Sequence, residues 1–387
     1  MTSKERVYAA LEGRLPDRVP YAEFAVDFDT VERLLGRETY LRAKAKSQIA
    51  FWEGRRDEVA QSWLEDHIAL QKMLPLDIVT FPMATWEMPP ETDDPPPRRI
   101  AATTWEDREG RVYRLSEATQ DITCVHDPVR DAKVFTAAEF EADGEPVRRD
   151  ERSWAILDAV IREFKDEKFI CGPSGGSVGI VLLGGMERGL LELAANPEAV
   201  RAATRSFVRR QNEADAVRIH PDSDAVMWDE DLGHKTGPLI GPAMFRDFFL
   251  EANKARARNV KERYGKKILK HCCGNINLLL DFFVEIGFDA YQSIQPTAGM
   301  DICRLKKDYG DRIALWGGVA VEHLVGGARR TSGPTSGGPW PAPSRAAGSS
   351  SARATASPSG RSSTTTWLCW TSTPGCVSIE DEDAGDA

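Results

Sequence analysis

A regular alternation of short apolar segments with helical segments constrains the fold of this chain more than any other feature. Apolar runs typical of buried strands occupy residues 166–176, 223–233, 266–275, 289–296 and 312–318. Amphipathic segments of helical period lie between them, and the loops are short. Strands that are apolar throughout and alternate with helices indicate a parallel sheet covered on both faces.

Each of these predicted strands ends in polar or glycine-rich sequence. A closed (β/α)8 barrel, the TIM barrel, places its chemistry at such strand ends, so we predict an α/β protein with this fold. A doubly wound sheet is the alternative. No GxGxxG or GxxxxGK[ST] motif follows a strand, and a nucleotide-binding fold therefore has no support.

The N-terminal part of the chain adds helices and an excursion. Amphipathic helices are predicted at residues 2–13 and 56–74, and a short buried strand at 76–82. Residues 87–147 become Pro-rich and then alternate in polarity. Residues 106–115 within them predict a β-hairpin, so we interpret this region as an excursion from the main fold.

The C-terminal tail differs from the rest of the chain. Ala328 to Cys376 contains no Asp, Glu, Lys, His, Asn, Gln, Tyr, Phe, Ile or Met. A natural low-complexity tail is one explanation, but such tails are usually poor in Trp and Cys, and this one is not. A shifted reading frame allows a helix, a strand and a second helix instead. We predict that residues 1–327 form a barrel without its last helix–strand–helix, and that residues 328–387 are out of frame and disordered.

Loss of the last strand has a physical consequence. An open barrel has two sheet edges with unpaired backbone groups, and the tail has few aliphatic side chains to cover them. We therefore expect a chain of marginal stability that is prone to aggregate.

The net charge limits the partners. A charge of −10 argues against nucleic acid and anionic membranes, which need basic surfaces. The first twenty residues lack an apolar signal-peptide core, and no window reaches the roughly 18 apolar residues of a membrane span. We expect a cytoplasmic protein with a small-molecule substrate.

Polar residues at the predicted strand ends are the candidates for chemistry. We predict catalytic roles for Asp229, Asp231 and His271, and substrate binding by Glu230, Asn275, Gln295, Gly317 and Gly318. Asp77 joins the catalytic candidates because an isolated acid in an apolar segment is unusual. Crowded carboxylates raise one another's pKa, which suits proton transfer. The alternative is that these acids cap helices or solvate loops.

His271 and Cys273 are the metal candidates. Residues i and i+2 of an extended segment point the same way, and imidazole with thiolate is a good zinc pair. The alternative is a hydrogen-bonded core histidine beside two small packing residues, Cys272 and Cys273.

Three segments carry a resemblance to a known family. Residues 5–24, 228–249 and 266–319 together resemble the uroporphyrinogen decarboxylase family, whose superfamily also contains zinc-dependent, corrinoid-linked methyltransferases. The resemblance covers about residues 3–327. It implies a single (β/α)8 barrel with its active site at the carboxyl ends of the strands, and many relatives are homodimers.

The decarboxylase branch implies decarboxylation of a tetrapyrrole or related carboxylated substrate in porphyrin metabolism, without a cofactor. Its members bind substrate carboxylates through arginines in an N-terminal Arg-Gln-Ala-Gly-Arg segment. Here residues 21–30 contain no arginine. Asp77 is the nearest counterpart of the family's acid, by its position relative to the first strand.

The methyltransferase branch implies zinc held by His-x-Cys and a later Cys, with a corrinoid protein as methyl partner. His271 and Cys273 match the first two ligands. The third would lie in the last strand, and Glu230 is a substitute ligand. A third hypothesis is an inactive product of a frameshifted gene.

Overall fold

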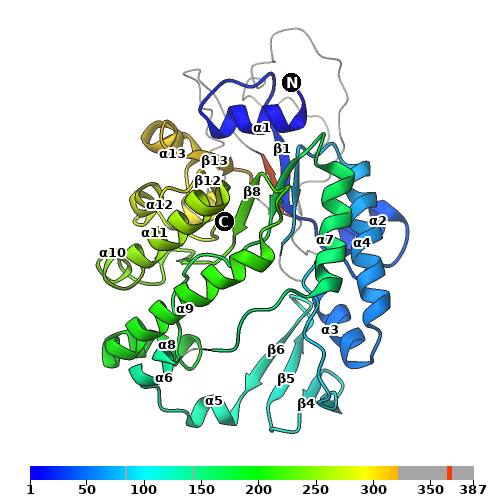
Figure 1. Cartoon of the computed structure of the whole chain (residues 1–387), viewed down its shortest axis with the longest axis vertical. Helices are drawn as coiled ribbons and strands as arrows, with labels where there is room; N and C mark the ends of the chain where they lie inside the picture. The colour runs from blue at the N-terminus through cyan, green and yellow to red at the C-terminus, as the bar shows by residue number, and fades with distance from the viewer. Residues whose placement is uncertain (83–84, 143, 321–363, 368–387) are drawn as a thin grey trace, which may run out of the picture.

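A curved parallel sheet forms the centre of the molecule (Figure 1). The computed structural model describes residues 1–82, 85–142, 144–320 and 364–367. Six parallel strands follow one another in the sheet in the order β13 (Ala314–Gly317), β12 (Ala290–Ile294), β11 (Lys267–His271), β8 (Ala225–Trp228), β7 (Phe169–Gly172) and β2 (Ile78–Thr80).

A further strand, β1 (Tyr21–Ala25), lies beside β2 at the edge of this sheet. The Asp77 N–H donates to the Tyr21 carbonyl oxygen (2.7 Å). The Thr80 hydroxyl donates to the Glu23 carbonyl oxygen (3.1 Å). The contacts run in the same order along both chains, so β1 and β2 are parallel. The described residues thus form an incomplete (β/α)8 barrel, which confirms the predicted fold class.

The described part of the tail is a single strand. β14 (Thr364–Trp367) pairs with β1 in antiparallel register, so it is not an eighth parallel strand. The predicted frameshift and disorder concern residues 328–387, and apart from β14 these lie outside the described residues.

The strands are apolar because both of their faces are buried. Ala225, Met227 and Leu269 point into the barrel, where they pack with Ala22, Ile78, Phe169, Cys171, Ala290, Ala314 and Trp316. Val226 and Trp228 point outward to the helices. Side chains alternate along a strand, so residues 229 and 271 continue the inward-facing series at the carboxyl ends.

Helices cover the outside of the sheet (Figure 1). The N-terminal ones are α2 (Phe28–Leu35), α3 (Lys44–Trp52), α4 (Arg56–Met73) and α7 (Glu151–Phe164), whereas α1 (Ser3–Leu11) lies at the amino end of the barrel, where Val7 packs with the inward-facing residues. The later ones are α8 (Met186–Ala195), α9 (Pro197–Arg218), α10 (Pro242–Phe245), α11 (Glu251–Arg258), α12 (Leu280–Ile286) and α13 (Ile302–Tyr309). Two π-helical segments, Arg246–Leu250 and Asn259–Arg263, flank α11. Among the helices described, none is both long and apolar enough to span a lipid bilayer.

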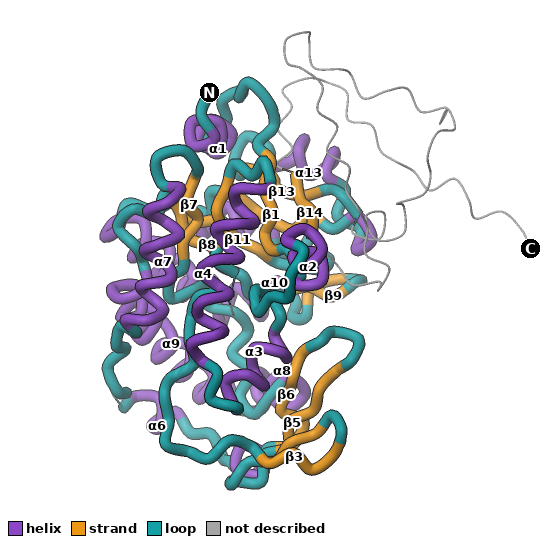
Figure 2. The backbone as a smooth tube through the Cα atoms, turned by 90° about the vertical axis from the view of Figure 1, so that its right-hand side faces the viewer, coloured by secondary structure: helices purple, strands orange, loops and turns teal. Residues whose placement is uncertain are grey.

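The excursion forms a separate four-stranded antiparallel sheet of β3 (Arg98–Ala101), β4 (Thr104–Glu106), β5 (Val112–Ser116) and β6 (Asp121–His126). The predicted hairpin is β4–β5. Trp52 of α3 packs against Trp105 and Tyr113, which attaches this sheet to the helices. α1 lies at one end of the molecule and this sheet at the other (Figure 2).

The excursion continues through two short helices, α5 (Pro128–Ala132) and α6 (Ala137–Glu141). After β8, the short antiparallel pair β9 (Gly233–His234) and β10 (Gly237–Pro238) precedes α10.

Candidate functional site

Three predicted site residues meet at the carboxyl end of the sheet. Asp231, His271 and Cys273 each offer one potential ligand atom, and these atoms lie within 4.8 Å of one another. His271 Nε2 is 3.4 Å from Cys273 Sγ and 3.6 Å from Asp231 Oδ1. A nitrogen, a sulfur and an oxygen donor therefore converge on one point.

The parallel pairing of β8 with β11 brings these residues together. Lys270 stands opposite Trp228 in the register, so the residues that follow both strands emerge side by side. The Cys273 N–H donates to Asp231 Oδ1 (2.7 Å). Gly274, with φ +80°, turns the chain away, and a Cβ there would approach the Gly233 carbonyl carbon to 2.5 Å.

His271 is held in one orientation. The Phe24 ring stacks on the imidazole, with 4.2 Å between the ring centroids. His271 Nδ1 bonds the side-chain oxygen of Gln292, a buried residue of β12. Because an amide oxygen only accepts, Nδ1 carries the proton and Nε2 presents its lone pair to Cys273 and Asp231. Burial lowers the pKa of His271, which keeps the ring neutral.

Sequence reasoning missed Gln292 and Phe24. The signal for Gln292 was a polar residue inside the predicted strand 289–296, two positions from Ile294 at its end. Nothing in the sequence near Phe24 marks it as a ring that stacks on a distant histidine.

The adjacent cysteines Cys272 and Cys273 lie in different environments. Cys272 is buried in the outer core, and burial raises its pKa to about 12. It is a packing residue, as the alternative interpretation had it. Cys273 is half-buried, and its Sγ lies 3.5 Å from Ser293 Oγ. Burial, then the negative charge of Asp231, raises the pKa of Cys273, so the thiol form is favoured while the site holds no cation.

The neighbouring acids differ from Asp231. Burial, then repulsion by Glu230, raises the pKa of Asp229. Glu230 is ion-paired with Lys270 (2.7 Å) and accepts a hydrogen bond from Ser177. Both of these donors bind Glu230 Oε2, and the carboxylate that lies beside His271 and Cys273 is that of Asp231. A role of Glu230 as substitute ligand stays a prediction.

The remaining predicted substrate-binding residues lie at the same end and shape its loops. Gln295 Oε1 accepts from the Gly274 N–H (3.1 Å). The Asn275 N–H donates to the His234 carbonyl oxygen (2.8 Å). Gly317 ends β13, and Gly318 follows it with φ +91°. Their direct contact with a substrate stays a prediction.

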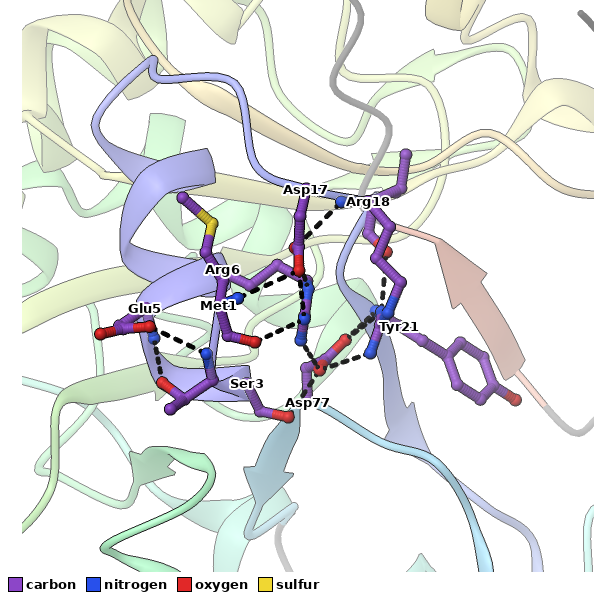
Figure 3. A network of polar contacts seen from close by, with 10 residues as sticks. Met1, Ser3, Glu5, Arg6, Asp17, Arg18, Tyr21 and Asp77 are labelled. Atoms are coloured by element: carbon purple, nitrogen blue, oxygen red, sulfur yellow. Dashed lines mark hydrogen bonds and ion pairs between the residues drawn. The ribbon is translucent and has the colours of Figure 1, made fainter. Parts of the chain in front are cut away.

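Asp77 lies elsewhere (Figure 3). It precedes β2, at the amino ends of the strands, and its side chain is fully buried. Its carboxylate accepts hydrogen bonds from Ser3 (2.6 Å), Arg6 (2.8 Å) and Arg18 (2.7 and 2.9 Å), and from the Tyr21 N–H (2.7 Å). The expectation that Asp77 shares the site is therefore corrected: a residue that begins a barrel strand faces the opposite rim.

Reactive side chains at the carboxyl rim of a parallel barrel are the arrangement of barrel enzymes. The uroporphyrinogen decarboxylase (URO-D) family model matches residues 128–331, more than half of the chain. The chain belongs to this family. No curated protein matches it. Among solved structures, a methyltransferase from Methanosarcina mazei is similar, with 16% identity and a TM-score of 0.47, over 81% of this chain and 82% of that one.

Proposed function

We propose that this protein is a zinc-dependent transferase that moves a methyl group between a corrinoid protein and a thiol. The observation that carries the proposal is the convergence of Asp231, His271 and Cys273. Imidazole, thiolate and carboxylate are the ligand types that zinc prefers, and a catalytic zinc takes three protein ligands and leaves one position open. The donor set of this site fits that requirement.

The residues of the chain would divide the work. A bound zinc lowers the pKa of a thiol, which then reacts as the thiolate. Gln292 and Phe24 orient His271 so that Nε2 faces the site. Asp231 is exposed and borders the side from which a substrate can enter. Asp229, whose pKa is raised, is suited to hold a proton near the rim.

A second candidate is cofactor-free decarboxylation of a tetrapyrrole or another carboxylated substrate. The raised pKa of Asp229 favours it, because a protonated carboxyl group can protonate the carbanion that loss of CO2 leaves. Two observations oppose it. Asp77 lies at the opposite rim, and residues 21–30 supply no arginine for substrate carboxylates.

Metal analysis of the full chain separates the two candidates. The proposed methyl transfer predicts that the chain retains about one zinc ion after dialysis and that the His271→Ala variant retains none. His234→Ala is the matched control, because His234 lies on the neighbouring loop, is exposed and is not among the three donors. Zinc content unaffected by His271→Ala, together with binding of a porphyrinogen, would favour the decarboxylase.

The frameshift remains a separate proposal about the gene. Its test is the nucleotide sequence over residues 328–376, which should encode a helix, a strand and a helix in the shifted frame. A shifted frame interrupted by stop codons would exclude it.

A further inference from the structure

We propose that Lys270, Glu230 and Ser177 form a buried clamp that positions Asp231 for the metal. This inference rests on the proposed function, because it assigns a purpose to residues that surround the donor set. None of the three touches the reacting atoms in this proposal, and all three act through Asp231.

Lys270 is the centre of the clamp. It precedes His271 in β11, and its side chain is 1% exposed. Its Nζ lies 2.7 Å from Glu230 Oε2, 2.8 Å from the Glu230 carbonyl oxygen and 3.3 Å from Ser177 Oγ. One ammonium group thus uses its three protons on three oxygens.

The contact with the Glu230 carbonyl oxygen acts directly on Asp231, since that carbonyl belongs to the peptide bond that joins the two residues. On the other side, the Cys273 N–H holds Asp231 Oδ1 (2.7 Å). The Leu232 N–H donates to Cys272 Sγ (3.1 Å). Residues 230–232 are therefore each attached to the end of β11.

Asp231 needs this support because it is the exposed member of the donor set. Its side chain is 54% exposed, against 9% for His271. An exposed carboxylate on a free loop would sample several positions, and fixing it at the moment of binding costs conformational entropy. A loop that is already fixed avoids that cost.

Ser177 connects the clamp to the outer helices. It follows a glycine pair whose backbone is held by a buried ion pair: the Gly175 N–H donates to Asp215 Oδ1 (2.8 Å), and the Gly176 carbonyl oxygen accepts from Arg256 (2.9 and 3.0 Å). Asp215 of α9 and Arg256 of α11 are both fully buried. The clamp is thus anchored to two helices as well as to the sheet.

A buried lysine is not explained by stability alone. Removing the two charged groups of an ion pair from water costs free energy, and replacing both partners by apolar side chains of similar volume is often neutral or stabilising. Groups that orient metal ligands, by contrast, typically change metal affinity by about 10- to 100-fold when they are removed. The contacts of Lys270 fit this second role.

The test is a Co²⁺ titration of the full chain, followed by the visible absorption of the bound ion. Lys270→Met should weaken binding by about 10- to 100-fold and alter the absorption spectrum, because the carboxylate ligand is displaced. Lys254→Met is the control for the loss of a lysine–glutamate pair, since Lys254 of α11 pairs with Glu285 (2.6 Å) and neither residue belongs to the donor set or to the clamp. Its affinity and spectrum should equal those of the wild type.

Three further variants, one at Ser177 and two at Glu230, keep the test decisive if Lys270→Met fails to fold. Ser177→Ala removes one contact of the clamp and should weaken binding less than Lys270→Met. Glu230→Gln retains an oxygen acceptor for Lys270 and should bind more tightly than Glu230→Met, which keeps a similar side-chain volume without an acceptor, so a general loss of packing would not reproduce the difference. Unaltered Co²⁺ affinity and spectrum in Ser177→Ala and Glu230→Met would overturn the clamp. A wild-type chain that binds no Co²⁺ would instead refute the proposed function.

Discussion

The two ends of the barrel use carboxylates in opposite ways. At the amino ends of the strands, Asp77 is fully buried and accepts hydrogen bonds from two arginines, a serine and a backbone N–H. At the carboxyl ends, Asp231 is half exposed, and among the described residues it has no ion pair with Lys or Arg. Its neighbours are a neutral imidazole and a thiol.

This difference separates residues that stabilise the fold from residues that are available to a ligand. The Asp77 network joins α1, the segment before β1 and the start of β2, so it closes the amino end of the barrel. Its hydrogen-bonding capacity is used within the protein. The potential ligand atoms of Asp231, His271 and Cys273 lie close together and are only partly engaged within the protein, which is why we propose them as a metal site.

The largest expected effect is on the amino end. Asp77→Ala removes the buried carboxylate that Arg6 and Arg18 share and leaves a cavity in its place. It should therefore lower the free energy of unfolding by about 3–5 kcal/mol. Urea denaturation followed by circular dichroism measures this. Asp231→Ala, at the other end, should change the unfolding free energy by less than about 0.5 kcal/mol. Equal destabilisation by the two variants would contradict the view that Asp77 stabilises the fold and Asp231 does not.

Replacement of a metal ligand at the carboxyl end should have a large effect on metal affinity and a small effect on the free energy of unfolding. Cys273→Ala is expected to weaken Zn²⁺ binding at least about 100-fold, since it removes a donor and not only its support. The unfolding free energy of the metal-free chain should change little, because Cys273 is only half-buried. Cys171→Ala is the control with opposite behaviour: a cavity inside the barrel lowers stability by about 1 kcal/mol, while metal affinity persists, because Cys171 is not among the three donors. Competition with a chromophoric chelator gives both affinities.

Arg18 offers a smaller test of the amino-end network. Its side chain is 48% exposed, and Asp77 keeps Arg6, Ser3 and the Tyr21 N–H when Arg18 is removed. Arg18→Ala should therefore cost about 1–2 kcal/mol, less than Asp77→Ala. Arg14→Ala, which removes an exposed pair with Glu12, should cost less than about 0.5 kcal/mol. If Arg18→Ala lowered the free energy of unfolding by as little as Arg14→Ala, Arg6 would be the only one of the two arginines that supports Asp77.

The smallest effect is the dependence of stability on pH. Burial would raise the pKa of Asp77, but hydrogen bonds from Arg18, Ser3 and the Tyr21 N–H outweigh it, and the pKa is lowered. A lowered pKa contributes stability above the unfolded value of about 3.9, and this stability disappears as the pH falls through the folded value. Below pH 4, the free energy of unfolding should fall more steeply with decreasing pH in the wild type than in Asp77→Asn. The difference between the two slopes should be at most about 1.4 kcal/mol per pH unit. Parallel curves would mean that Asp77 does not titrate with unfolding.

Much of the fold could be predicted because it follows from local patterns. The apolar runs at 266–275 and 289–296 became β11 and β12, and Pro197 separates α8 from α9 as its missing N–H requires. Thr2, at the start of the first predicted helix, is its N-cap and forms a capping box with Glu5. These features depend on neighbouring residues and on the burial of both sheet faces.

The candidate site could be predicted only in part. The spacing of His271 and Cys273 placed both side chains on one side of the chain, since the period of a strand is two residues. Asp77 was misplaced because it was selected as an isolated acid in an apolar segment and by its position relative to the first strand, and neither feature decides which rim of the barrel the carboxylate faces. Lys270 and Gln292 were missed because their partners are 40 and 21 residues away.

The sequence alone therefore determined the alternation of strands and helices and the types of donor atom at the strand ends. Both follow from local periodicity and side-chain chemistry. The tertiary structure decided which carboxylate faces the imidazole, which ammonium group is buried beside Glu230 and which acid closes the opposite rim. Those choices depend on strand register and on the burial of charges, which are properties of the assembled barrel and not of any segment.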